Sequence, residues 1–267
     1  MENAGVERAW VRVPGAAVRW LDDLDPGQPS GYEPPRRPDA AWILHAMYAW
    51  EEGLVTTTHD DLHRSVRAVW PPERPETGEA GEVLADLEEI TIDTGTDLGR
   101  TGRPGRGWRR LRWRELARGF GEPVVPDGRR PGNRCLRQAH PAGSWSAAIR
   151  PPAEGCLDRE SWHRLIGILL RHSPSGDGTR CLAYYCPLVT NDWDEDTVLV
   201  GRLGDAGALY DHPDMESCPS NLWAEDRSWI VYCDWDLWGT KVVGPTSLVD
   251  DLLADPELEC VRLPWTS

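Results

Sequence analysis

Apolar positions in the N-terminal part of the chain recur at the spacing of a helix. Between Asp39 and Gly53 they fall three and four residues apart, which predicts one helix that begins at Asp39 and ends at the glycine. A second helix is predicted as far as Val69, because Thr58 and Asp61 have the spacing of a capping box. Together the two segments predict an N-terminal helical hairpin.

The second half of the chain has more regular patterns. Asp158 is a favourable N-cap for a helix whose apolar stripe runs from Trp162 to Leu170. Short apolar runs bounded by turn residues predict strands over residues 144–149, 181–186 and 198–203.

The C-terminal pattern predicts two strands, a helix and a third strand. The strands over residues 229–235 and 240–243 flank a short turn and read as a hairpin. A helical stripe over residues 246–254 and an apolar run over residues 260–263 follow. This order is a β-β-α-β unit.

These elements predict an α+β fold with a mixed or antiparallel sheet. The length of 267 residues is compatible with one hydrophobic core, so we expect a single domain over residues 1–267. Its predicted sub-regions are a helical N-terminal part (1–93), an irregular segment rich in Arg, Gly and Pro (94–141) and a sheet-rich C-terminal part (142–267).

Composition predicts an acidic cytoplasmic protein. Its net charge of −15 disfavours polyanionic partners such as nucleic acid and acidic membranes, and it favours a basic protein. The sequence contains neither an apolar run long enough to cross a bilayer nor a signal peptide at its start. Seven scattered cysteines favour reduced, buried thiols over a disulfide framework.

A basic segment interrupts this acidic chain. Between Gly99 and Arg137, twelve arginines face three acidic residues, a balance of +9 that leaves −24 for the rest of the chain. Trp108 and Trp113 lie among these arginines, and such a mixture can hold phosphates and stack bases. RNA association is therefore one alternative function, and pairing of the arginines with acids of the same protein or of another subunit is the other interpretation.

Two histidines provide a candidate for metal chemistry. His59 and His63 are four residues apart, so on a helix they share a face and can share a zinc or similar divalent ion. Asp60 stands where a metallohydrolase has its catalytic base, although the familiar motif has Glu there and no third ligand follows by spacing. A metal-dependent hydrolase is thus the first alternative function, and RNA association is the second; otherwise no cofactor is predicted.

Tryptophan is unusually frequent, with 15 residues against one phenylalanine. Tryptophan fills protein cores and also anchors interfaces. Trp235 and Trp238 flank the predicted hairpin turn, where burial is less certain than within strands, so they are the best interface candidates. Asp234 and Asp236 would point to the same side of an extended chain there.

The segment from Asn221 to Trp229, continuing through Asp234–Asp236 to Glu259, resembles the C-terminal block of uncharacterised actinobacterial cytosolic proteins. That resemblance implies kinship and no particular substrate. With no complete catalytic constellation in the chain, we predict a non-catalytic protein-interaction module, either immunity-like or regulatory. The predicted binding residues are Trp223, Asp226, Arg227, Asp234, Trp235, Asp236 and Trp238.

Overall fold

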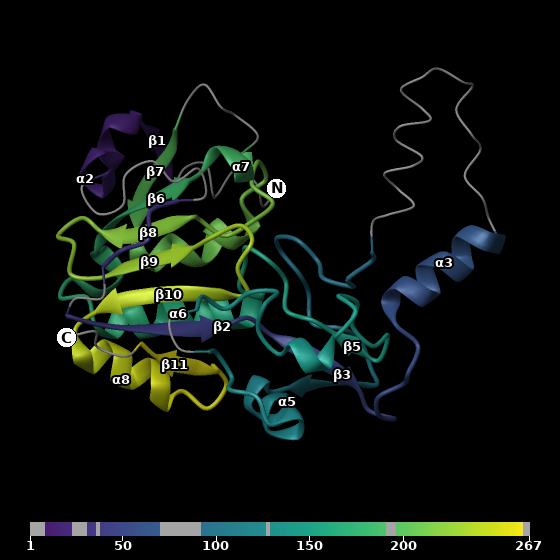
Figure 1. Ribbon diagram of the computed structural model, residues 1–267. Coiled ribbons are helices and arrows are strands. Elements are labelled where there is room, and N and C mark those ends of the chain that lie inside the picture. The colour runs from purple at the N-terminus through teal and green to yellow at the C-terminus, as the bar shows by residue number, and fades with distance from the viewer. Residues whose placement is uncertain are drawn as a thin grey trace, which may run out of the picture.

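The fold combines two antiparallel sheets with helices, as the computed structural model shows (Figure 1). The structure describes residues 9–22, 31–35, 38–69, 92–126, 129–190 and 196–263. Within these residues every pairing between strands is antiparallel. The predicted α+β class is therefore confirmed, and the sheet is antiparallel.

The larger sheet has eight strands and the smaller has three. In spatial order the large sheet contains β1 (Val11–Val13), β7 (Thr197–Arg202), β6 (Arg180–Tyr185), β8 (Asn221–Ala224), β9 (Ile230–Cys233), β10 (Gly239–Gly244), β2 (Asp39–Leu44) and β11 (Cys260–Arg262). The small sheet contains β4 (Trp108–Leu111), β3 (Met47–Trp50) and β5 (Ile149–Arg150).

The α-helices are α2 (Arg19–Asp22), α3 (His59–Val69), α5 (Trp113–Phe120), α6 (Arg159–Arg171), α7 (Pro187–Thr190) and α8 (Thr246–Ala254). The 3₁₀ helices are η1 (Gly15–Val18), η2 (Arg137–Ala139), η3 (Gly176–Gly178) and η4 (Leu203–Asp211). None of the helices in the described ranges is long and apolar enough to cross a membrane.

Both faces of the large sheet are covered. Alternate residues such as Val231 and Val242 join the core built with α6, η4 and α8. On the opposite face, Ile230 packs with the segment of η1 and α2, and Tyr232 packs with side chains of the small sheet. Because successive strand residues point to opposite faces, a sheet covered on both faces needs strands that are apolar at successive positions, as β9 is.

The helix predicted from Asp39 is wrong. Residues 39–50 form β2 and β3, so the described residues contain no N-terminal helical hairpin. This run is apolar at almost every position, so helical spacing occurs in it by default. β2 is buried along its whole length, and a strand covered on both faces shows no alternation that would distinguish it from a helix.

Most other expected elements occur at the expected places. The Thr58 capping box is present, with the Thr58 amide donating to Asp61 Oδ2 (3.0 Å) and the Asp61 amide to Thr58 Oγ1 (3.1 Å). The Asp158 cap of α6 is also present, accepting from the Ser161 amide at 3.0 Å. The strand expected over residues 144–149 is confined to β5, and the segment 94–141 contains β4 and α5.

In the C-terminal part, β9 and β10 pair as a hairpin, and α8 and β11 follow in sequence. However, β11 pairs with β2, which lies between β10 and β11. The C-terminal elements therefore form a continuous sheet only with a strand from the N-terminal part.

A distant carboxylate caps α5. Glu259, which precedes β11 and is almost completely buried, accepts the backbone amides of Trp113 and Arg114 at 2.8 and 2.9 Å. The guanidinium of Arg114 also donates to this carboxylate, at 3.1 Å. The first amides of a helix have no partner within the helix, and Glu259 supplies one for two of them. Because Glu259 precedes β11, this contact attaches the basic segment to the edge of the large sheet.

Candidate functional site around Trp235

Trp235 is the most exposed tryptophan in the described part of the chain, at 37%. It lies in the turn between β9 and β10, where the Leu237 amide donates to the Asp234 carbonyl at 3.3 Å. Leu237 and Trp238, later in the same turn, point inwards: Leu237 is buried and Trp238 is 2% exposed. The turn thus exposes one large aromatic side chain, and the buried side chains of Leu237 and Trp238 hold the turn in place.

Trp235 borders a hollow of about 210 Å³ with an apolar rim and an acidic group. Leu98 on this rim is 63% exposed, so the rim presents apolar surface to solvent. We call this the Trp235 surface; it consists of Leu98, Gly99, Leu188, Val189, Glu216, Ser217 and Trp235. Two of these residues, Leu188 and Val189, belong to the short helix α7.

Backbone contacts join the loops that build the Trp235 surface. The Gly99 amide donates to the Glu154 carbonyl (2.8 Å), and the Arg100 amide donates to the Glu216 carbonyl (3.0 Å). The Gly155 amide donates to the Leu237 carbonyl at 3.0 Å. These contacts connect loops that are far apart in sequence, so the surface is built by tertiary structure.

Two glycines allow these loops to meet. Gly155 has a φ of 72°, and a Cβ placed there would lie 2.6 Å from the Trp235 carbonyl oxygen. Gly99 has a φ of 74°, and its Cβ would lie 2.7 Å from the Glu216 carbonyl oxygen. Any side chain would meet rigid backbone at either position, in a conformation that disfavours L-residues.

Acidic groups gather around the turn. Partial loss of solvent around the carboxyl group, and then the nearby charge of Asp234, raises the pKa of Asp236, although the residue as a whole is exposed. Burial is also the largest cause that raises the pKa of Glu154, which accepts from Trp238 Nε1 at 3.3 Å and feels the charge of Asp236. Asp234 itself accepts from the Tyr232 hydroxyl at 2.7 Å. The carboxylates therefore repel one another, which favours a cation beside them.

The nearby arginines are engaged with other groups. The Arg100 guanidinium donates to the carbonyls of Tyr210 and Met215, and Arg130 pairs with Glu33, although its charge also reaches Asp234 and Asp236. These contacts leave Glu216 and Asp236 as exposed acids beside an exposed tryptophan and leucine.

The structure divides the predicted binding residues into separate places. Trp223 and Trp238 are buried in the core. Asp226 and Arg227 lie in the turn between β8 and β9, at the opposite end of β9 from Trp235. There the Arg227 guanidinium covers the ring of Trp20 (4.4 Å), and hydrogen bonds from Ser228 lower the pKa of Asp226.

Asp234, Trp235 and Asp236 are thus the predicted residues that do share one site. No pattern in the sequence indicates Leu98, Glu154 and Glu216, which join them only through folding.

The predicted metal residues on α3 have other partners. The ring of His59 bonds through Nε2 to the Ile149 carbonyl at 2.8 Å. Asp60 pairs with Arg64 at 2.7 Å and accepts the Asp93 amide, whereas His63 Nδ1 lies 3.9 Å from Asp93 Oδ2. Among the residues that the structure describes, no group of three His, Cys, Asp or Glu side chains is placed to hold a metal ion.

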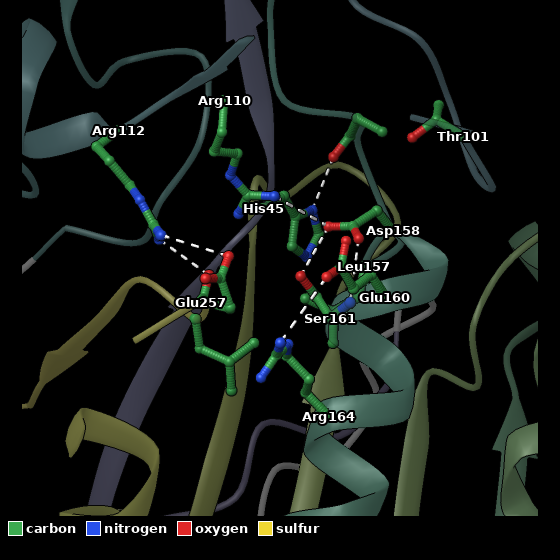
Figure 2. Close-up of polar contacts among 12 residues, drawn as sticks. His45, Thr101, Arg110, Arg112, Leu157, Asp158, Glu160, Ser161, Arg164 and Glu257 are labelled. Carbon is green, nitrogen blue, oxygen red and sulfur yellow. Dashed lines mark hydrogen bonds and ion pairs between the residues drawn. The ribbon is translucent and has the colours of Figure 1, made fainter. Parts of the chain in front are cut away.

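Arginines of the basic segment pair with acids elsewhere in the same chain. Figure 2 shows Arg110 reaching Asp158 (3.5 Å) and Arg112 reaching Glu257, whose carbonyl it contacts at 2.9 Å. Of the two tryptophans in this segment, Trp113 is buried and Trp108 packs edge-on against Trp50 at 5.5 Å. The intramolecular interpretation of the basic segment is therefore confirmed for these arginines.

A larger hollow, of about 560 Å³, lies at the start of α6. Three of its lining residues, Asp158, Glu160 and Arg164, are drawn in Figure 2. Its charges are largely compensated within the molecule, because Arg159 pairs with Asp211 and Arg164 pairs with Asp255. The same region contains Asp158, whose carboxylate already accepts hydrogen bonds from the Ser161 amide and hydroxyl. This hollow offers a ligand less uncompensated charge than the Trp235 surface does.

Comparisons with known proteins add no relative to this picture. No family model matches the chain, and neither the curated proteins nor the solved structures contain a match.

Proposed function

We propose that the chain is a non-catalytic cytoplasmic protein-binding module whose Trp235 surface binds a cationic, partly apolar segment of a partner protein. The observation that carries the proposal is the exposed Trp235 beside Leu98 and Glu216, at a turn where neighbouring carboxylates repel one another. An aromatic anchor within a polar rim is the usual composition of an interface hot spot.

Charge supports a basic partner. The chain carries −15 overall, and Arg109, Arg110 and Arg114 of its basic segment pair with Glu115, Asp158 and Glu259 of the same chain, so its outward field is acidic. Such a field accelerates association with a cationic partner and suppresses anionic ones. An immunity-like or regulatory role, in which a basic protein is held inactive, fits this chemistry.

The alternatives draw less support from the geometry. A hydrolase built on His59 and His63 needs both imidazoles at one ion, and the His59 ring nitrogen Nε2 is directed at a backbone carbonyl instead. RNA association needs free arginines and exposed aromatic rings, and residues 108–114 provide paired arginines and a buried Trp113.

The test uses defined peptides and the intact chain. A peptide that alternates arginine with leucine should bind, and replacement of Trp235 by alanine should weaken this binding by about tenfold or more, because a hot-spot anchor is lost. Asp236→Asn should weaken it less. Titration calorimetry gives both affinities, and the folded state is checked by thermal melting.

The matched control is Leu253→Ala, which removes a similarly exposed apolar side chain (38%) on α8. It should leave the affinity unchanged. Equal affinity of wild type and Trp235→Ala for the peptide, or equal binding of a peptide with glutamate in place of arginine, would rule out the Trp235 surface as the binding site.

Binding of the cationic peptide should also weaken on acidification, starting at a higher pH than for ordinary carboxylates. Glu154 and Asp236 have raised pKa values, so they take up protons early as the pH falls and lose the charge that attracts the peptide. Calorimetry across a pH series measures the effect. Asp236→Asn should reduce the slope, and an unchanged slope would exclude Asp236 from the binding site.

A further inference from the structure

Two cysteines from distant segments meet beneath the Trp235 surface. Cys156 and Cys218 are 62 positions apart in sequence, yet their sulfur atoms are 2.6 Å apart, and both side chains are buried. The Cys218 amide donates to the Cys156 sulfur at 3.1 Å, so the backbone itself directs one residue towards the other. All seven cysteines are present as free thiols.

The backbone around the two cysteines is fixed in position by neighbouring contacts. Next to the cysteines, the Ser217 hydroxyl donates to the Gly155 carbonyl at 2.6 Å. Gly155 in turn packs against Trp235, and Ser217 lines the hollow of the Trp235 surface. The two loops are therefore already fixed side by side, so a bond between the sulfurs requires little backbone movement.

We propose that Cys156 and Cys218 are an oxidative modification site, at which an intramolecular disulfide cross-links the two loops beneath the Trp235 surface. This inference does not rest on the proposed function. Each thiol gives up one hydrogen atom, and two electrons pass to an external oxidant. With hydrogen peroxide the products are the disulfide and two water molecules; with oxidised glutathione they are the disulfide and two molecules of reduced glutathione.

The surroundings predict a slow reaction that is specific to this pair. Burial and the neighbouring sulfur of Cys156 raise the pKa of Cys218, so the thiolate that attacks the oxidant is scarce. Three other buried thiols have different neighbours: Cys135 and Cys181 contact the backbone carbonyls of Arg130 and Thr179, and Cys233 contacts the Thr240 hydroxyl. They lack the second sulfur that would complete a disulfide in place.

The experiment maps disulfides in the intact folded chain after exposure to hydrogen peroxide or oxidised glutathione at mildly alkaline pH. Tryptic cleavage places Cys156 in the peptide 138–159 and Cys218 in the peptide 203–227, and each of these peptides contains one cysteine. Mass spectrometry without reductant should find these two peptides joined, and dithiothreitol should separate them.

The joined peptides should be absent from Cys156→Ser and Cys218→Ser and present in the control Cys135→Ser. The oxidised wild type should melt roughly 5–10 °C higher than the reduced protein, since the cross-link closes a long loop. The mapping needs only wild-type protein, so misfolding of a variant does not affect it. Absence of the joined peptides from oxidised protein that keeps its circular dichroism, or equal cross-linking among the other cysteines, would overturn the proposal.

Discussion

Replacement of Gly155 by alanine should lower the free energy of unfolding by roughly 3–5 kcal/mol, the largest loss expected from any methyl-sized change described here. Two effects add. The φ of 72° disfavours an L-residue, and the new Cβ would stand 2.6 Å from the Trp235 carbonyl oxygen and 2.9 Å from the Trp235 Cα. Both neighbours are backbone atoms, so neither can rotate away. Urea denaturation of the two proteins measures the difference.

Gly121 provides a matched control. It ends α5 at a φ of 68°, close to that of Gly155, and a Cβ there would meet nothing within 4 Å. Gly121→Ala should therefore lose only the backbone contribution, about 1–2 kcal/mol. Equal losses in the two variants would show that the close approach of Gly155 to the Trp235 turn contributes nothing. Gly155→Ala should also bind the cationic peptide less well, because the turn must shift.

Acidification should destabilise the protein through His45. This residue forms the corner between β2 and β3, and both its ring nitrogens are bonded: Nδ1 lies 2.7 Å from the Ala153 carbonyl and Nε2 lies 3.0 Å from the Thr240 hydroxyl. Since a carbonyl only accepts, Nδ1 carries the proton and Nε2 accepts. Burial is the main cause that lowers the pKa of His45 from 6.5 to about 4. The charge of Arg110 lowers this pKa further, whereas the charge of Asp158 raises it.

The sign follows from linkage between protonation and folding. The unfolded chain takes up a proton near pH 6.5, whereas the folded chain resists this until about pH 4. The contribution of His45 is therefore complete above pH 6.5 and is lost progressively as the pH falls towards 4, by about 3 kcal/mol in total. Denaturation at a series of pH values measures the loss.

His45→Gln removes the titrating group and should flatten this part of the pH profile. At neutral pH the variant should be less stable by about 1–3 kcal/mol, because a buried hydrogen-bond partner is lost. The exposed His163 on α6 serves as the control, since His163→Gln removes an imidazole without opening the core. A profile in His45→Gln as steep as that of wild type would contradict the assignment.

Local chemistry predicted the helices that carry their own caps. Each cap joins two residues that are three positions apart, Thr58 with Asp61 and Asp158 with Ser161, so a short stretch of sequence contains the whole interaction. The C-terminal hairpin and α8 were predictable for the same reason. β2 was not, because an apolar run covered on both faces satisfies the helical and the extended pattern equally.

The site was predictable only in its local part. Trp235 and its two flanking aspartates share a turn. The same turn argument applies to Trp238, yet Trp235 is 37% exposed and Trp238 only 2%, so turn position alone does not separate the exposed tryptophan from the buried one. Leu98 and Glu216 come to this turn through contacts between distant loops, which no spacing in the sequence encodes. The same limit applies to the Glu259 cap of α5, which joins residues about 145 positions apart.

The position of β2 between β10 and β11 affects how the chain matures during synthesis. Ile43 pairs with Thr240 on one side and with Cys260 on the other, so both neighbours of β2 leave the ribosome roughly two hundred residues after it. Until then a strand of apolar residues has two unpaired edges, a state that invites aggregation. β10 and β11 therefore complete the pairing of β2, and a nascent chain interrupted before residue 239 lacks both strands that protect β2.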